Sequence, residues 1–478
     1  MSTLPELKLA RRTPASSALH GVPMTSEAVS DESGDLPWAQ LSAQGFTGKV
    51  AERAVVTVGD KVHCLIGLGA AEDVDAQVWR RVGVSLARAA SRVKSASIAV
   101  DGDTDVEALA EGLTMGAYSY QEFKSDAKKP TLKTITIAGT TSKKSTDAVA
   151  SGTAAANAVC VTRDFVNEPG GSLTPEKFAN EAKKIARQPG LTIKVLGLPE
   201  IRKAKLGGLL GVNRGSTLPP RLVEMSYRSG IKGAPTIALV GKGITFDAGG
   251  LSIKTTAGMA TMKCDMGGGG AVLGAMSALP ERKPKVNVKA WVPMTDNMLG
   301  GDATRMGDVL TIRNGKTVEI LNTDAEGRLI LADGLSLASE AKPDAIIDLA
   351  TLTGAAMVSL GRDYAALMSN NDAFAAQVEA AADQAGELVW RLPLPPRYRK
   401  LLDSPIADMK NVGGPYAGSI TAALFLQEFV AEGIPWAHLD IAGPAFTDSP
   451  TETGPKGGTG YAVRTLISLI ENFTPPAT

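Results

Sequence analysis

The chain has 478 residues, of which 44% are hydrophobic and 21% are charged, and its 50 basic residues equal its 50 acidic residues. This is the composition of an ordinary globular protein, so extensive disorder is not expected, and the length predicts two domains. Because the formal net charge is zero, no general field would attract nucleic acid or an anionic membrane.

The sequence does not resemble that of a membrane or secreted protein. No apolar run reaches the roughly 18 residues of a spanning helix, and the first residues lack the apolar block of a secretory signal. The three cysteines are scattered at Cys64, Cys160 and Cys264, which fits a reducing compartment and no disulfide framework. We therefore expect a cytoplasmic protein that makes no membrane contact.

The N-terminal third alternates predicted strands and helices. Residues 1–40 mix Pro, Ser, Asp and Glu without periodicity, which predicts a poorly ordered lead-in. Short apolar runs predict strands at 61–69, 95–100 and 132–138, and apolar residues spaced by three and four predict helices at 74–93 and 106–118. Together they predict a small α/β domain over residues 41–147.

A helix predicted at 148–166 ends where Pro169 and two glycines follow, so residues 148–170 are expected to connect this domain to the next. Over residues 171–478 strand and helix patterns alternate again. β-branched apolar runs at 236–240, 286–292 and 345–350 carry few charges, as strands covered on both faces do. The second domain should contain a mostly parallel sheet, with working residues beyond the carboxyl ends of its strands.

Several familiar signatures are missing from the chain. It contains no His-Glu-x-x-His, no Cys-x-x-Cys, no P-loop and no Gly-x-Ser-x-Gly elbow, so the common hydrolase and nucleotide-binding signatures are excluded. The turn at Gly67 to Gly69 lacks the third small position of a dinucleotide fingerprint and is more simply a turn.

The most informative segment is 322–329, which reads Asn-Thr-Asp-Ala-Glu-Gly-Arg-Leu. One residue separates Asp324 from Glu326, so in an extended segment both carboxylates point to the same side. Neighbouring carboxylates repel unless cations lie between them. Four more charged residues occur upstream in apolar or glycine-rich stretches, at Lys242, Asp247, Lys254 and Asp265. Any one acid could be a solvated loop residue, but the whole set predicts a carboxylate cage for two metal ions.

Because histidines are scarce, such metals would be held mainly by oxygens. Oxygen ligands suit Mn²⁺ or Mg²⁺, and Zn²⁺ also accepts carboxylates. Two ions sharing bridging carboxylates would activate a water molecule and polarise a carbonyl group. Hydrolysis is therefore the expected reaction.

These residues are similar to the signature of the leucyl aminopeptidases, a cytosolic two-metal family whose hallmark is the octapeptide at 322–329. The resemblance covers roughly residues 160–478, including 164–169, 240–250, 262–267 and 457–464, and is loose in the N-terminal part. It departs from the family pattern at Gly268 to Gly270 and at Tyr461-Ala462. The resemblance implies a macro-like N-terminal α/β domain, a larger catalytic α/β domain, and release of leucine-like residues from peptide N-termini.

The resemblance also implies a role for each charged residue. Asp247 and Glu326 would bridge two divalent ions, Mn²⁺ or Zn²⁺ with Mg²⁺ as a further candidate. Asp324 would complete one metal site, and Lys242 with Asp265 would complete the other. Lys242 would have to bind as the neutral amine, so the metal and burial would have to lower its pKa far below the ordinary value.

Catalytic and substrate roles follow from the same resemblance. Lys254 would stabilise the oxyanion, and Arg328, with Gly327 and Leu352, would hold a bicarbonate that shuttles the proton. One metal would take the free α-amine of the peptide, which restricts cleavage to the first residue. The pocket for the first side chain would be lined by Met262, Asn322, Thr351, Thr353, Gly354 and Ala442. For Met262 a plain core role is almost as well supported. We interpret Cys264 and His438 as packing residues, with Cys264 pointing away from Asp265 if the segment is extended.

The resemblance further implies a homohexamer that acts on peptides. One alternative is a nucleic-acid-binding regulatory protein that uses its N-terminal domain. The basic residues between Arg80 and Lys94 would have to form an exposed patch for this, but they are more simply the solvated face of a helix. Another alternative, a two-metal phosphohydrolase, lacks any matching motif.

Overall fold

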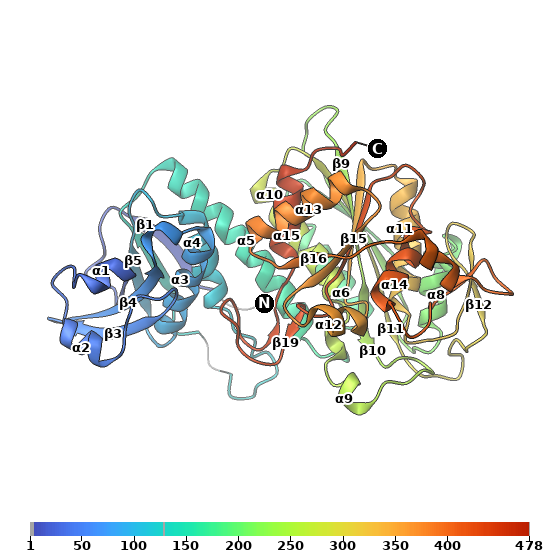
Figure 1. Ribbon diagram of the computed structural model, residues 1–478, viewed down its shortest axis with the longest axis horizontal. Coiled ribbons are helices and arrows are strands. Elements are labelled where there is room, and N and C mark those ends of the chain that lie inside the picture. The colour runs from blue at the N-terminus through green and yellow to red at the C-terminus, as the bar shows by residue number, and fades with distance from the viewer. Residues whose placement is uncertain (1–3, 128–129, 478) are drawn as a thin grey trace. The chain divides into compact units, whose positions relative to one another are not determined.

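The computed structural model describes residues 4–127 and 130–477. The chain divides into two compact units (Figure 1). The N-terminal unit contains residues 1–160 and 449–456, and the C-terminal unit contains residues 161–448 and 457–478. Helix α5 (Lys143–Asn167) runs through the boundary between them, where the connecting helix was predicted. Both units are α/β, which confirms the predicted fold class.

The N-terminal unit is built on a six-stranded sheet in the order β1-β6-β5-β2-β4-β3 over the described residues. Its strands are parallel except for β3, which is antiparallel to β4. The strands are β1 (Glu6–Ala10), β2 (Leu19–Thr25), β3 (Arg53–Val58), β4 (Lys61–Gly69), β5 (Ser95–Ala99) and β6 (Thr134–Ala138). Its helices are α1 (Ser26–Ser30), α2 (Trp38–Ala43), α3 (Ala76–Ala89), α4 (Val106–Gly116) and the 3₁₀ turns at Ala71–Asp73 and Ala90–Arg92.

The predicted lead-in over residues 1–40 is wrong, because β1, β2 and two helices begin there. Within β1 the half-buried Leu7 and Leu9 pack against the apolar core of the unit, while Glu6 and Lys8 are exposed. This alternation has the period of a strand. It spans only five residues beside a proline and two arginines, too short a stretch for the pattern to stand out.

The C-terminal unit contains a nine-stranded, mostly parallel sheet over the described residues, as predicted. Its central order is β15-β18-β14-β9-β11-β8, and β10 pairs with β11. The strands are β7 (Leu191–Leu196), β8 (Arg221–Tyr227), β9 (Thr236–Gly241), β10 (Gly243–Asp247), β11 (Asn287–Asn297), β14 (Ala345–Ala350), β15 (Ala365–Ser369), β16 (Val389–Arg391) and β18 (Trp436–Asp440). Small sheets are formed by β12 (Val309–Thr311), β13 (Thr317–Glu319) and β17 (Met409–Lys410), and by β19 (Phe446–Thr447) and β20 (Gly457–Gly458).

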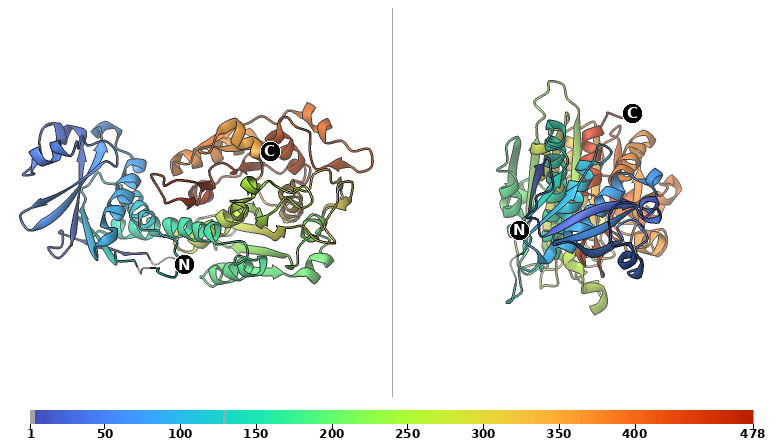
Figure 2. Two further views of the ribbon diagram at one scale, coloured as in Figure 1. Left: turned by 90° about the horizontal axis from the view of Figure 1, so that it is seen from below. Right: turned by 90° about the vertical axis from the view of Figure 1, so that its left-hand side faces the viewer.

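Helices cover both faces of this sheet (Figures 1 and 2). One face packs against α6 (Pro175–Ile185), α10 (Gly267–Arg282), α13 (Asp372–Ala385) and α15 (Val463–Asn472). The other packs against α7 (Leu198–Lys203), α8 (Gly207–Asn213), α11 (Gly327–Glu340) and α14 (Gly418–Gln427). Shorter elements are α9 (Thr256–Met259), α12 (Gly354–Leu360) and the 3₁₀ turns Met262–Cys264 and Pro396–Leu402.

The glycine run that opens α10 sets how closely this helix approaches the sheet. A Cβ at Gly268 would lie 2.1 Å from the carbonyl oxygen of Leu349 in β14, and one at Gly269 would lie 2.7 Å from Val292 Cγ1 in β11. Side chains at these two positions would push the helix away. The departure from the family pattern at Gly269 therefore has a packing reason in this chain.

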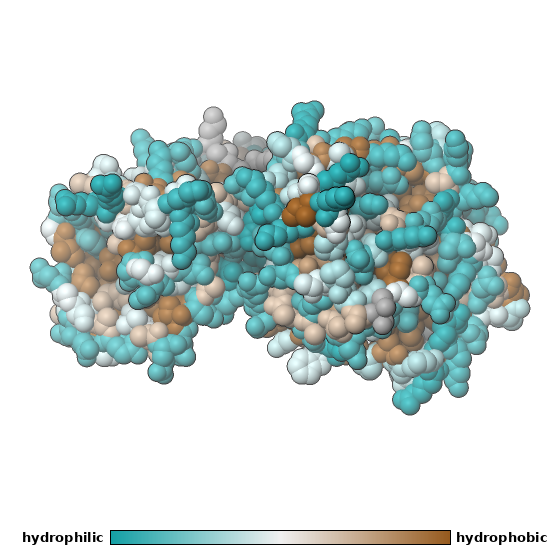
Figure 3. Space-filling model, turned by 90° about the horizontal axis from the view of Figure 1, so that it is seen from above, coloured by the Kyte–Doolittle hydropathy of each residue, from teal (hydrophilic) through white to brown (hydrophobic). Residues whose placement is uncertain are grey.

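No helix among residues 4–127 and 130–477 is both long and apolar enough to span a bilayer. On the face drawn in Figure 3, hydrophilic residues surround small groups of apolar ones in both units.

Candidate active site

A cavity of about 660 Å³ lies in the C-terminal unit beyond the carboxyl ends of β10, β14 and β18. Its lining comes from the end of β10, the segment 254–265, the start of α11, and the loops that follow β14 and β18. Ligand sites in open α/β sheets form at this edge. The cavity therefore lies where the sequence predicted the working residues.

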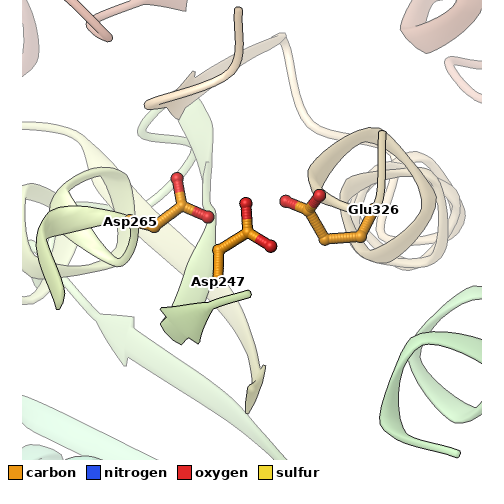
Figure 4. Close-up of side chains that lie close together, drawn as sticks. All are labelled: Asp247, Asp265 and Glu326. Carbon is orange, nitrogen blue, oxygen red and sulfur yellow. The ribbon is translucent and has the colours of Figure 1, made fainter. Parts of the chain in front are cut away.

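Three buried carboxylates converge in this cavity (Figure 4). Asp247 ends β10, Asp265 follows the 3₁₀ turn at Met262–Cys264, and Glu326 directly precedes α11. One oxygen from each carboxylate lies within 4.8 Å of the others, and no more than 4% of any of these residues is exposed. Acids this close in a dry environment require neighbouring cations.

Lys242, between β9 and β10, supplies one of those cations. Its Nζ lies 2.8 Å from Asp265 Oδ1 and 2.9 Å from Glu326 Oε1. Its backbone is fixed on both sides, because its N–H donates to Leu349 O and its carbonyl accepts from Gly269 N. The sheet and the first turn of α10 thus aim this side chain into the acids.

Lys254 and Asp324 complete the cluster. Lys254 Nζ lies 2.8 Å from Asp247 Oδ2 and 2.5 Å from Asp324 Oδ1. Asp324 lies in a turn and Glu326 has helical backbone angles, so the expected extended segment is wrong: the start of α11 draws these residues into helical geometry. Both carboxylates nevertheless line the cavity, and the six predicted acids and lysines form one cluster.

Burial dominates the electrostatics of the acids. It raises the pKa of Asp247 to about 6, with a further rise from the neighbouring charge of Glu326. It also raises the pKa of Asp265 well above the ordinary range and raises the pKa of Asp324. Burial opposes the charged form of Lys242, but the carboxylates of Asp265 and Glu326 outweigh it and raise the lysine pKa. Here Lys242 is an ammonium, and a neutral ligand role requires a metal ion to replace its proton.

The cluster fits divalent metal ions. Asp265 Oδ2 and Glu326 Oε2 are buried and have no hydrogen-bond partner within residues 4–127 and 130–477. Leaving a buried acceptor unpaired costs about 1–3 kcal/mol, and more for a charged group. A donor set of carboxylates and one amine suits Mn²⁺, Mg²⁺ and Zn²⁺.

Two neighbours that the sequence did not assign to the metal cluster orient its carboxylates. Asn297 Nδ2 donates to Asp247 Oδ1 at 2.8 Å and to Thr323 O at 3.0 Å. Thr351 Oγ1, assigned to the substrate pocket, donates to Asp265 Oδ1 at 2.8 Å. Asn297 is opposite Asp247 in the pairing of β10 with β11, so its place at the end of a buried strand was the available signal.

Arg328 lies in the first turn of α11, behind the residues that line the cavity. Its Nη1 donates to Asn411 O at 2.8 Å, and its buried Nε has no partner in the described part of the chain. Burial lowers the pKa of Arg328 to about 10, against the opposing charges of Glu326 and Asp440. The side chain therefore remains a cation at neutral pH with a donor to spare for an anion.

Gly327 separates Glu326 from Arg328 and touches the cluster directly. A Cβ at this position would lie 2.6 Å from Lys242 Cε and 2.7 Å from Lys242 Nζ. At these distances a Cβ would force the end of the Lys242 side chain to move, so the glycine of the octapeptide leaves room for the lysine in its present position.

Most of the predicted pocket residues line the cavity, namely Met262, Thr351, Thr353, Gly354 and Ala442, and so does Leu352 of the predicted anion site. Asn322 does not. Its Oδ1 accepts from Asp324 N at 2.8 Å and so holds the turn instead. Sequence reasoning missed Met357 and Phe446, which also line the cavity and carry no motif. Cys264 is buried, in agreement with its predicted packing role, but it lines the same cavity as Asp265, so the expected opposite direction is wrong because the segment is a 3₁₀ turn and not extended.

Asp440, at the end of β18, fixes two walls of the cavity. Its carboxylate accepts from Leu352 N at 3.1 Å, Thr353 Oγ1 at 2.6 Å and Ala442 N at 3.2 Å. His438 on the same strand is fully buried and bonds to Asp348 at 2.6 Å, which confirms its predicted core role.

The cluster of four acids and two lysines, at the carboxyl edge of a mostly parallel sheet, is typical of a hydrolase whose side chains could hold metal ions. The chain belongs to the cytosol aminopeptidase family: the model of the family's catalytic domain matches residues 160–467, and that of its N-terminal domain matches residues 18–127. It is therefore an aminopeptidase.

Similar proteins cover nearly the whole chain. A probable cytosol aminopeptidase of Streptomyces avermitilis is 45% identical over 90% of this chain and 88% of the relative, and one of Alkaliphilus metalliredigens is 42% identical over 92% of both. Among solved structures, the bottromycin maturation enzyme BotP in complex with Mn is 38% identical, with a TM-score of 0.87 over 95% of this chain and 99% of that one. A mutant of tomato leucine aminopeptidase is 33% identical, with a TM-score of 0.90 over 99% and 98%.

Proposed function

We propose that this aminopeptidase is a leucyl aminopeptidase that uses two divalent metal ions. The observation that carries the proposal is the cluster of Asp247, Asp265, Asp324, Glu326 and Lys242, whose unpartnered buried oxygens face a cavity large enough for a peptide end. The Mn-bound structure of BotP supports a metal of this type.

Within this proposal, Asp247 and Glu326 would be ligands for both ions, Asp324 would complete one site, and Lys242 with Asp265 would complete the other. When bound, the ions, Mn²⁺ or Zn²⁺ with Mg²⁺ as a further candidate, supply Lewis acidity and a water of lowered pKa. Other residues of the chain fix the orientation of these ligand side chains. The bonds from Asn297 to Asp247 and from Thr351 to Asp265 support this.

Lys254 and Arg328 serve as the catalytic cations in the proposal. Burial opposes the charge of Lys254, but Asp247 and Asp324 outweigh it and raise its pKa, so its ammonium persists and can donate to an oxyanion in the cavity. Arg328, with the backbone at Gly327 and Leu352, would hold a bicarbonate, which would supply a general base that the chain's own residues do not provide.

The preference for leucine rests on the cavity wall. Met262 and Met357 line it with Ala442 and Gly354, which together provide an apolar surface that adapts to a branched aliphatic side chain. The acidic end of the cavity favours a substrate that carries a free α-amine.

We further propose a cytoplasmic homohexamer. Exposed apolar residues gather where the loop 251–253 meets the segments around Met306 and Leu321: Ile253 is 58% exposed and Met306 is 53% exposed. Ser252 joins these segments through its bonds to Thr323 and Met306. An apolar patch of this kind favours self-association, which light scattering would measure.

The nucleic-acid alternative has no comparable support. On α3, Arg80 is buried and paired with Glu111, Arg81 lies 2.9 Å from Glu452, and Arg88 donates to a backbone carbonyl. These arginines are occupied by contacts inside the N-terminal unit.

The test compares leucinamide with N-acetyl-leucinamide, using protein stripped by a chelator and then resupplied with Mn²⁺ or Zn²⁺. Release of free leucine from leucinamide alone, and only with metal, is the expected result. Cleavage without metal, or of the acetylated substrate, would overturn the mechanism.

A further inference from the structure

The cavity has a second charged end. Among the described residues that line it, Arg362 and Asp448 are the only charged side chains outside the acid and lysine cluster. Arg362 Nη1 donates to Asp448 Oδ2, and the two side chains are 59% and 56% exposed. A pair with this exposure contributes little stability, so a competing anion displaces it at small cost.

Arg362 is held at a defined distance from the inner wall. It follows α12, and the residue that caps the start of α12, Thr353, lines the inner part of the cavity. Seven helical residues span about 10 Å, and an extended peptide of two or three residues spans about 7–10 Å. The backbone at Gly361 packs against Gly443, where a Cβ would lie 2.7 Å from Gly361 O. The arginine therefore extends from a tightly packed turn.

We propose that Arg362 binds the free C-terminal carboxylate of dipeptides and tripeptides, which makes very short peptides the preferred substrates. This inference rests on the proposed aminopeptidase mechanism, in which the acidic end of the cavity takes the α-amine. A guanidinium has five N–H donors, and the structure assigns one of them to Asp448. The remaining donors suit the two oxygens of a carboxylate.

The test uses Leu-Gly, Leu-Gly-Gly and Leu-Gly-Gly-Gly-Gly, each as the free acid and as the C-terminal amide. The quantity measured is the acid-to-amide ratio of kcat/KM. In the parent protein we expect a ratio of about five for the two shorter peptides and about one for the longest. A fivefold ratio corresponds to the upper end of the free energies, about 1 kcal/mol, that exposed ion pairs contribute. In Arg362→Gln the ratio should fall to about one at every length, mainly through KM.

Matched variants separate this role from a general effect of charge. Asp448→Asn removes the competing carboxylate and should keep or raise the ratio for the short acids. Arg397→Gln changes an exposed arginine outside the cavity and should leave all ratios unchanged. Equal ratios in the parent and in Arg362→Gln would overturn the inference while leaving leucinamide hydrolysis intact. Loss of leucinamide hydrolysis in the parent would instead overturn the proposed function, and the inference with it.

Discussion

Each unit places titratable side chains of the same kind close together with little solvent around them. The two units differ in how they avoid the free-energy cost of burying like charges. In the N-terminal unit the rings of His20 and His63 lie 5.4 Å apart, and His20 Nδ1 bonds to Ser97 Oγ. Burial, together with the nearby Lys61, lowers the pKa of both rings, so the pair stays neutral. In the C-terminal unit the lysines that lie among the acids offset part of the cost of burying their charge. Only the second solution leaves charged ligands for a metal.

The largest effect should come from breaking the acid and lysine cluster. Glu326→Gln removes the charge that both Lys242 and the metals need, and Lys254→Ala removes the oxyanion donor. We expect either change to lower leucinamide turnover by about a thousandfold or more, with an unchanged circular dichroism spectrum. Glu432→Gln, on the exposed surface, is the control. Normal activity in either variant would remove the site assignment.

Metal binding should depend steeply on pH in the C-terminal unit. Mn²⁺ must displace the proton of Lys242, whose pKa is raised, and must compete with protonation of Asp247, whose pKa is about 6. Affinity should therefore fall as the pH drops from 7.5 to 5.5, and binding should release protons. Calorimetry in two buffers of different ionisation enthalpy measures this release. A pH-independent affinity with no proton release would contradict the assignment of Lys242 as a ligand.

A smaller effect is expected on the stability of the metal-free protein. Burial raises the pKa of Asp247 from 3.8 to about 6, so this group costs stability as the pH rises through that interval, by about 3 kcal/mol when complete. Asp247→Asn should stabilise the metal-free protein at pH 7 and abolish its stabilisation by Mn²⁺. Urea unfolding with and without chelator measures both. Asp383→Asn, an exposed residue outside the cavity, should change neither.

The smallest effect concerns the two histidines and the pH dependence of the stability of the N-terminal unit. Since the pKa of His20 and of His63 is lowered in the folded state, their neutral pair contributes fully above pH 6.5 and loses its contribution as the pH falls below it. His63→Gln should make unfolding of the N-terminal unit less sensitive to acid, while leucinamide turnover at pH 7.5 stays unchanged. Hydrogen exchange of β2 and β4 at pH 5.5 and 7.5 would detect the difference, and equal sensitivity in both proteins would argue against the pair.

Two kinds of feature could be predicted from the sequence: helices and strands with clear apolar patterns, and charged residues that occur in apolar stretches. The strand at 345–350 is reproduced residue for residue, and every acid and lysine of the cluster was named in advance. Their signal was chemical, because charges in apolar stretches need partners wherever the chain folds.

What the sequence could not predict depended on tertiary neighbours. Strand β1 is stable because it pairs with β6, more than 120 residues away. The sequence of residues 6–10 alone contains no signal for that pairing. Asp440 and Asn297 act through bonds to backbone and side chains on other strands. Cys264 was misplaced because one turn of 3₁₀ helix replaces the assumed extended backbone, which reverses the direction of a side chain.

The absence of a side chain at Gly327 links the packing of α11 to the arrangement of the acids and lysines. Gly327 is the first residue of α11, and a methyl group there would displace the end of the Lys242 side chain from its contacts with Asp265 and Glu326. Most of α11 is buried, but at this position a side chain would meet the lysine of the cluster. The octapeptide thus contributes candidate metal ligands and also, at Gly327, the space that Lys242 occupies.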